Sequence, residues 1–144
     1  MKLTLEQHSN VETEIIIRYS VMDQRLQRVV EEIRMGEFTL PCKAGIAVFA
    51  VPADTAYYME SVDGKTFVYT ENNEYESALS LASIEIRLEA AGFVRISKSC
   101  ILNLHYLKCV TPLWNARLEA SMKNGERLII TRHYVDALKE KLGI

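Results

Sequence analysis

The chain has 144 residues, of which 49% are hydrophobic and 25% charged, and its formal net charge is −2. This is the composition of an ordinary globular domain with enough residues to bury a core of its own. No apolar run approaches the roughly 18 residues of a membrane span, and the N-terminus lacks the apolar stretch of a signal peptide, so we expect a cytoplasmic protein.

Charge is divided unevenly along the chain. Residues 95–144 contain nine Lys and Arg against four Asp and Glu, a net charge of +5. Residues 1–94 contain eight against fifteen, a net charge of −7. A basic segment of this kind, in a chain that is nearly neutral as a whole, indicates binding of a polyanion.

Residues 1–43 are predicted to form an N-terminal strand-helix extension. Residues 13–19 alternate in the manner of a strand. Apolar residues recur at helical spacing from Met22 to Ile33, which predicts an amphipathic helix of about three turns that ends at Gly36. The apolar stripe of this helix could cover the first sheet or dock on a second subunit, and the sequence leaves both open. We assign the extension to dimerisation or partner docking.

The main domain, residues 44–144, is predicted to be mainly β. A buried strand is expected over residues 46–51. The strands on either side of Asp63-Gly64 should form a hairpin, because glycine tolerates the positive φ of a tight turn. A second hairpin is expected at Asn124-Gly125, where alternating strands flank the clearest turn signal in the chain.

Two short helices are expected in the same domain. One spans residues 83–91 and ends at Gly92, and the other is the last element, with Thr131 as its N-cap. Arg132 and His133 then occupy a first turn, where a helix carries roughly half a positive charge. Cations are unfavourable there unless an anion lies opposite. This turn is therefore a candidate phosphate or base-edge contact, or else a solvated pair without a role.

A second group of candidate contacts follows the strand that begins at Phe93. Arg95, Lys98 and Ser99 form a basic-polar cluster beside Ser97. The hydroxyls and the ammonium group of the loop at 97–99 suit phosphate binding, although such residues are also common in solvated turns. Trp114, in a later loop, could stack on a base or pack at the edge of the core. The sequence leaves both alternatives open.

Signatures of enzymes are absent from the sequence. It contains no G-x-S-x-G, no glycine-rich phosphate loop and no H-E-x-x-H. The three histidines lack metal-ligand spacing, and the three cysteines form no C-x-x-C pair. We expect reduced thiols, no metal, no cofactor and no enzymatic activity.

Four blocks of the main domain occur in a recognisable order. They are Y-Y-M-E-S at residues 57–61, F-V-R-I-S-K-S-C-I-L-N at 93–103, L-W-N-A-R at 113–117, and K-N-G-E at 123–126 followed by T-R-H-Y-V at 131–135. Together they resemble the LytTR family of DNA-binding domains, with Ala116 at a position where glycine is commoner. The resemblance covers residues 44–144.

The resemblance implies a largely β domain, α+β overall, with several packed antiparallel sheets and short helices. Such domains read DNA with loops rather than with a recognition helix. The family positions that contact DNA correspond here to Lys65 and Thr66, to Ser97 and Lys98, and to Arg132, and we expect Ser99 and His133 to support them. Ser97 stands where many members have histidine, which leaves the base preference open.

The resemblance also bears on regulation and partners. The residues before the domain are too few for a receiver domain, so it implies a stand-alone regulator. We predict a sequence-specific transcription regulator that binds double-stranded DNA as a homodimer, with a small inhibitory membrane protein as a further partner. Two other functions stay open: an adaptor that binds an acidic protein through the same basic face, and a small-molecule sensor that uses the apolar extension.

Overall fold

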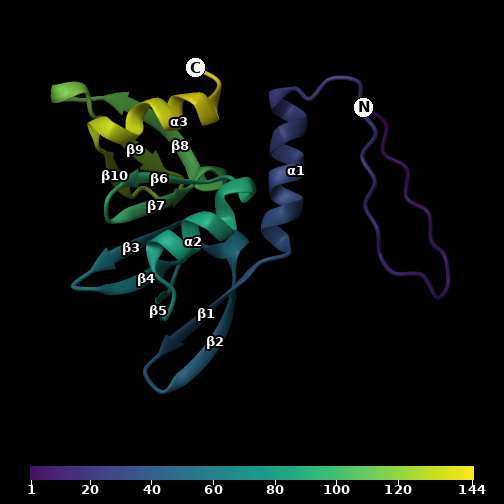
Figure 1. Ribbon diagram of the computed structural model, residues 1–144, viewed down its shortest axis with the longest axis horizontal. Coiled ribbons are helices and arrows are strands. Elements are labelled where there is room, and N and C mark those ends of the chain that lie inside the picture. The colour runs from purple at the N-terminus through teal and green to yellow at the C-terminus, as the bar shows by residue number, and fades with distance from the viewer.

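Figure 1 shows the computed structural model, which describes all 144 residues and contains two antiparallel sheets and three α-helices. The larger sheet has seven strands in the order β2-β1-β5-β4-β3-β7-β6, and the smaller has three in the order β10-β9-β8. The larger sheet consists of β1 (Thr39–Ala44), β2 (Ala47–Pro52), β3 (Tyr58–Val62), β4 (Lys65–Tyr69), β5 (Glu74–Ser77), β6 (Phe93–Ser97) and β7 (Cys100–Asn103). The smaller sheet consists of β8 (Leu107–Pro112), β9 (Leu118–Met122) and β10 (Arg127–Ile130).

The three helices are short and have local signals at their ends. Helix α1 (Gln24–Gly36) begins where the carboxylate of Asp23 accepts the N–H of Leu26 at 2.8 Å. Helix α2 (Leu81–Leu88) has Ser80 as its N-cap, and α3 (Val135–Leu142) ends at a glycine in the left-handed conformation. None of the three has the length and apolar character needed to cross a membrane.

Two hydrophobic cores lie on opposite sides of the β6–β7 ribbon. Phe93 and Ile101 belong to the first core, which also holds residues of α2 and β3. Ile96 and Leu102 belong to the second core, with residues of β9, β10 and α3. Successive side chains of a strand point to opposite faces, so β6 and β7 supply both cores at once. The ribbon is therefore held from both sides, and its turn projects from a well-fixed base.

The local signals in the main domain are confirmed. At the β3–β4 turn, Asp63 and Gly64 both have positive φ, 50° and 77°, as a two-residue hairpin of this type requires. Gly125, with φ 90°, lies in the β9–β10 turn. The helix expected over residues 83–91 is α2 followed by a single 3-10 turn, and it ends at Gly92 as predicted.

Two strand predictions are wrong. Residues 13–19 form no strand, because no other strand lies beside them to pair with their backbone groups. The strand predicted as buried over 46–51 exists as β2, but Val51 is its only buried residue and Val48 is 83% exposed. An apolar run is covered only where another layer lies over it, and β2 is the edge of its sheet.

The helix of the N-terminal extension is confirmed, and it packs on the main domain with half-buried residues along its length. Met35 is the only buried residue of α1 and belongs to the first core. Strand β1 runs across the proposed division at residue 44 and pairs along its whole length with β2. The division of the chain at residue 44 stays a prediction. It falls within β1, the first strand of the large sheet.

Candidate nucleic-acid interface

The centre of the candidate interface is the turn between β6 and β7. A bulge between Arg95 and Ser97 adds one residue to β6. The hydroxyl of Ser97 accepts the N–H of Ser99 at 3.2 Å, and the two hydroxyl oxygens lie 3.4 Å apart. Lys98 is exposed between them. The turn thus presents an ammonium group and two hydroxyls from a fixed backbone.

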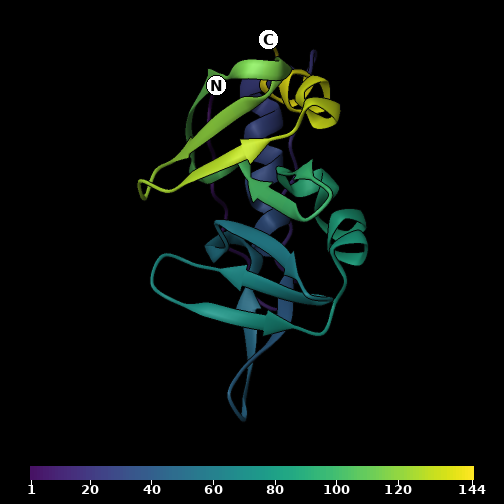
Figure 2. The same ribbon diagram turned by 90° about the vertical axis from the view of Figure 1, so that its left-hand side faces the viewer.

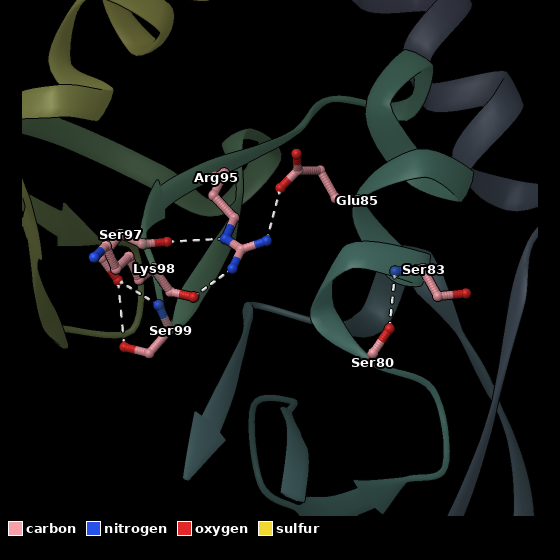
Figure 3. Close-up of polar contacts among 7 residues, drawn as sticks. All are labelled: Ser80, Ser83, Glu85, Arg95, Ser97, Lys98 and Ser99. Carbon is pink, nitrogen blue, oxygen red and sulfur yellow. Dashed lines mark hydrogen bonds and ion pairs between the residues drawn. The ribbon is translucent and has the colours of Figure 1, made fainter. Parts of the chain in front are cut away.

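Arg95 lies beneath this turn and not on its outer side. Its Nε donates to the carbonyl of Ser97 at 2.9 Å, and a terminal nitrogen donates to the carbonyl of Lys98 (Figure 3). The other terminal nitrogen pairs with a carboxylate oxygen of Glu85, on α2, at 3.0 Å. Each of the three guanidinium nitrogens therefore has a partner inside the protein.

The β3–β4 hairpin is joined to the same turn. The N–H of Ser61 donates to the carbonyl of Ser99 at 2.8 Å, at the end of β3 where the hairpin turn begins. Lys65 is exposed as the first residue of β4. Thr66, in contrast, is only 5% exposed, so its side chain is not on the surface of this structure.

The segment that leads into α3 is the third part. The N–H of Thr131 donates to the carbonyl of Ile96 at 2.9 Å, and its hydroxyl lies 3.4 Å from the same oxygen. The predicted capping bond of Thr131 is wrong, because its hydroxyl is used at the β6 bulge and caps no helix N–H. Arg132 and His133 are exposed in a single 3-10 turn before α3. The structure thus brings the three predicted segments together through hydrogen bonds to one turn.

A fourth loop, which sequence reasoning left undecided, lies beside the third. Leu118 pairs with both Pro112 and Ile130, so the β8–β9 loop and the residues after β10 leave the small sheet at the same end. Trp114 in this loop is 86% exposed, which excludes the core-packing alternative. Its exposure depends on packing, and no pattern in the sequence could have identified it.

The four segments follow one another along one edge of the molecule. In Figure 1 they run up the left-hand side, from the β3–β4 turn through the β6–β7 turn to the start of α3 and the β8–β9 loop. In Figure 2, where that side faces the viewer, they form a column toward the right of the view. Exposed cations at this edge come from three of the segments and an exposed indole from the fourth.

Two titratable groups of the large sheet, the thiol of Cys100 and the phenol of Tyr69, are held neutral near the charged groups of this edge. Burial, and then the neighbouring carboxylate of Glu60, raises the pKa of the Cys100 thiol to about 12, although Arg95 acts in the opposite direction. Burial also raises the pKa of Tyr69 to about 12, and its phenol donates to Glu60 at 3.4 Å. A neutral thiol is a poor nucleophile, so the arrangement suits binding rather than covalent chemistry.

Antiparallel sheets that present cations, hydroxyls and an aromatic ring along one edge are suited to a nucleic-acid-binding domain. The chain belongs to a family of this class, the LytTr DNA-binding domain, whose model matches residues 47–143. The fold predicted for the main domain, packed antiparallel sheets with short helices, is confirmed.

Known proteins with similar sequences are bacterial regulators. The chain is 25% identical to the sensory transduction protein LytT of Bacillus subtilis over 127 residues, which are 88% of this chain and 53% of LytT. It is 30% identical to the transcriptional regulatory protein LytR of Staphylococcus aureus (strain MW2) over 82 residues, which are 57% of this chain and 33% of LytR. The chain spans about half the length of the LytT relatives it matches, or less.

A solved structure has the same fold. It is the LytTr DNA-binding domain of a Bacillus cereus protein described as a methyl-accepting/DNA response regulator. The two superpose with a TM-score of 0.71 at 28% sequence identity, over 76% of this chain and 100% of the solved one.

Proposed function

We propose that this chain is a sequence-specific transcription regulator that binds double-stranded DNA through the loops along one edge of its β domain. The observation that carries the proposal is the joining of Lys65, Lys98 and Arg132, on three separate segments, through hydrogen bonds to the β6–β7 turn. These three cations and Ser97 approach base edges or phosphates, with Ser99 and His133 in support. Thr66 is left out of the proposed contacts because it is buried.

The proposal is tested by selecting a duplex from a random-sequence library and titrating it against a shuffled duplex. The selected duplex should bind more tightly, and its affinity should fall steeply with salt as counterions are released. Arg132→Ala should weaken specific binding by about 1–3 kcal/mol if the arginine reads a base edge. Arg25→Ala is the matched control, since Arg25 is exposed on α1, away from the proposed edge (Figure 1). Equal affinities for both duplexes would reject sequence-specific recognition.

The same titration separates this function from the adaptor alternative. An adaptor that binds an acidic protein through the basic edge would discriminate poorly between duplexes of equal length and charge. A DNA reader discriminates because base contacts, unlike phosphate contacts, depend on sequence. The family is one of DNA-binding domains, and we propose neither enzymatic activity nor a cofactor.

For the N-terminal extension, residues 1–43, we propose a role in dimerisation. Ile15 and Ile16 are 63% and 62% exposed, and α1 buries only Met35, so the extension has apolar surface that the single chain does not cover. A C2 dimer on repeated DNA sites would follow. Light scattering should give twice the chain mass for the wild type and the chain mass for Ile16→Asp. Val48→Asp, at an exposed position of β2 outside the extension, should leave the dimer intact.

Location and partners complete the proposal. We place the regulator in the cytoplasm, where DNA is accessible, and propose a small inhibitory membrane protein as a partner of the extension. Co-purification of the full chain with such a protein, lost on removal of the apolar residues of the extension, would support this. The small-molecule sensor remains the alternative role for the extension, and it predicts a ligand-dependent rise in melting temperature.

A further inference from the structure

The position of Arg95 in β6 sets its side chain apart from the exposed cations. Arg95 pairs with Ile101 across the ladder, and Ile101 faces the first core. Directly paired residues of an antiparallel ladder share a face. The guanidinium consequently lies between the ribbon and α2, and the Arg95 side chain is only 22% exposed.

The contacts of Arg95 constrain the backbone of the recognition turn. It donates to two consecutive carbonyls, those of Ser97 and Lys98, and thereby fixes both peptide planes of the turn. Hydrogen bonds from an ionised donor are about twice as strong as those between neutral groups. Because the Lys98 carbonyl is held toward Arg95, the backbone that carries the exposed Lys98 side chain has one orientation.

Glu85 in turn holds the guanidinium. Its carboxylate lies 3.0 Å from Arg95, and it comes from the second turn of α2. The start of that helix is set by Ser80, whose hydroxyl accepts the N–H of Ser83 at 3.2 Å (Figure 3). A chain of contacts thus runs from the α2 cap through Glu85 and Arg95 to the turn.

We propose that Arg95, held by Glu85, is a positioning residue for DNA recognition that orders the β6–β7 turn without touching DNA. This rests on the proposed function, since it concerns how that same edge binds its target. The alternative is that Arg95 swings out and contacts a phosphate itself. The two differ in what removal of the Glu85 charge does.

The two roles of Arg95 predict opposite effects of Glu85→Gln on specific DNA binding. Removing a negative charge strengthens the attraction of the protein for any DNA, and it also frees an arginine that would contact phosphate. A positioning role predicts the reverse for specific binding. The ratio of affinities for the selected and shuffled duplexes should fall about five- to tenfold, as when a charge-assisted hydrogen bond that supports a site is lost. Glu89→Gln removes the same charge from an exposed position beyond the end of α2 and should leave the ratio unchanged.

A second measurement reports directly on the order of the β6–β7 turn. Hydrogen exchange of the Ser99 amide, which donates to the Ser97 hydroxyl, should speed up in Glu85→Gln and in Arg95→Lys, with melting temperatures close to that of the wild type. Arg95→Lys keeps the charge but cannot bond two carbonyls and a carboxylate in one plane. Arg87→Lys, on the exposed side of α2, is its control.

The possible outcomes distinguish failure of the positioning role of Arg95 from failure of the proposed function. If the wild type prefers the selected duplex and Glu85→Gln behaves like Glu89→Gln, the positioning role is refuted while the proposed function stands. Stronger binding of Glu85→Gln to both duplexes, with unchanged Ser99 exchange, would favour direct phosphate contact and likewise refute it. If the wild type shows no preference for any duplex, the proposed function itself fails. A reduced ratio together with faster Ser99 exchange supports the proposal.

Discussion

Replacing Asn103 with alanine should destabilise the fold more than any substitution at the proposed DNA-facing edge. Asn103 has no exposed surface. Its amide nitrogen donates to the carbonyl of Ala56 at 2.8 Å, and its oxygen accepts the N–H of His105 at 3.0 Å. The same nitrogen lies 3.5 Å from the sulfur of Met35, so the residue also ties α1 to the sheet.

The magnitude follows from the groups that would lose their partner. A buried polar group left unsatisfied costs about 1–3 kcal/mol. The Ala56 carbonyl lies deep and should cost near the middle of that range, whereas the His105 N–H is partly accessible and should cost less. The expected loss is about 2–4 kcal/mol, a large share of the stability of a small domain.

Urea unfolding followed by circular dichroism, with linear extrapolation to water, measures this loss. Asn72→Ala is the matched control because Asn72 is exposed in the loop between β4 and β5, and its change should stay within about 0.5 kcal/mol. A loss below about 1 kcal/mol for Asn103→Ala would refute the argument that these hydrogen bonds anchor the domain.

Three further predictions concern strain, pH and the fourth loop. Ala116→Gly should raise the stability by about 1 kcal/mol in urea unfolding, because Ala116 has φ 57°, while Ala82→Gly in α2 should lower it by a similar amount. Burial raises the pKa of Cys100 from 9.0, and of Tyr69 from 10.0, to about 12. Their neutral forms favour the folded state below the unfolded pKa values, so stability should fall as the pH rises from about 9 toward 12, and a flat profile there would contradict this. Trp114, the only tryptophan, should be quenched readily by iodide in the free protein and protected by the selected duplex; unchanged quenching at saturation would remove its loop from the interface.

Elements with local causes were predictable from the sequence. The two hairpin turns need positive φ, and Asp63, Gly64 and Gly125 adopt it. Helix α1 was predictable because its apolar residues recur at helical spacing and Gly36 ends it. The strand expected over residues 13–19 failed because a strand requires a neighbour, which no local pattern provides.

The candidate interface was predictable in its members but not in its construction. The family blocks pointed to Lys98 and Arg132, but the hydrogen bond that joins their segments runs between residues 35 apart in sequence and depends on a bulge in β6. The structure also places Arg95 and Thr66 differently from what the sequence predicted, again because their positions depend on packing. Arg95 was grouped with the exposed cations and is bound internally, and Thr66 was expected at the surface and is buried. Which face of a strand a residue occupies depends on packing.

Part of the negative charge of the acidic half lies away from the proposed DNA-facing edge, at the other end of the large sheet, and Glu85 beside the edge is paired with Arg95. Lys65 begins β4, whereas Glu71 and Glu74 follow that strand's far end. The length of β4 thus separates the lysine from those acids, whereas Asp63 lies in the turn next to it. A net charge near zero is compatible with DNA binding when the local field at one edge is positive.

The last helix is poorly suited to reading DNA by itself, which leaves that role to the loops. Helix α3 has eight residues, a rise of about 12 Å, and packs into the second core through Val135 and Leu138. Arg132 precedes its first turn, in a segment bonded to the β6 bulge. The exposed face of α3 carries the carboxylates of Asp136 and Glu140 beside Lys139, and carboxylates are unfavourable next to phosphates. What α3 contributes is the fixed end from which Arg132 projects, so substitutions that loosen its packing should act on DNA binding through Arg132.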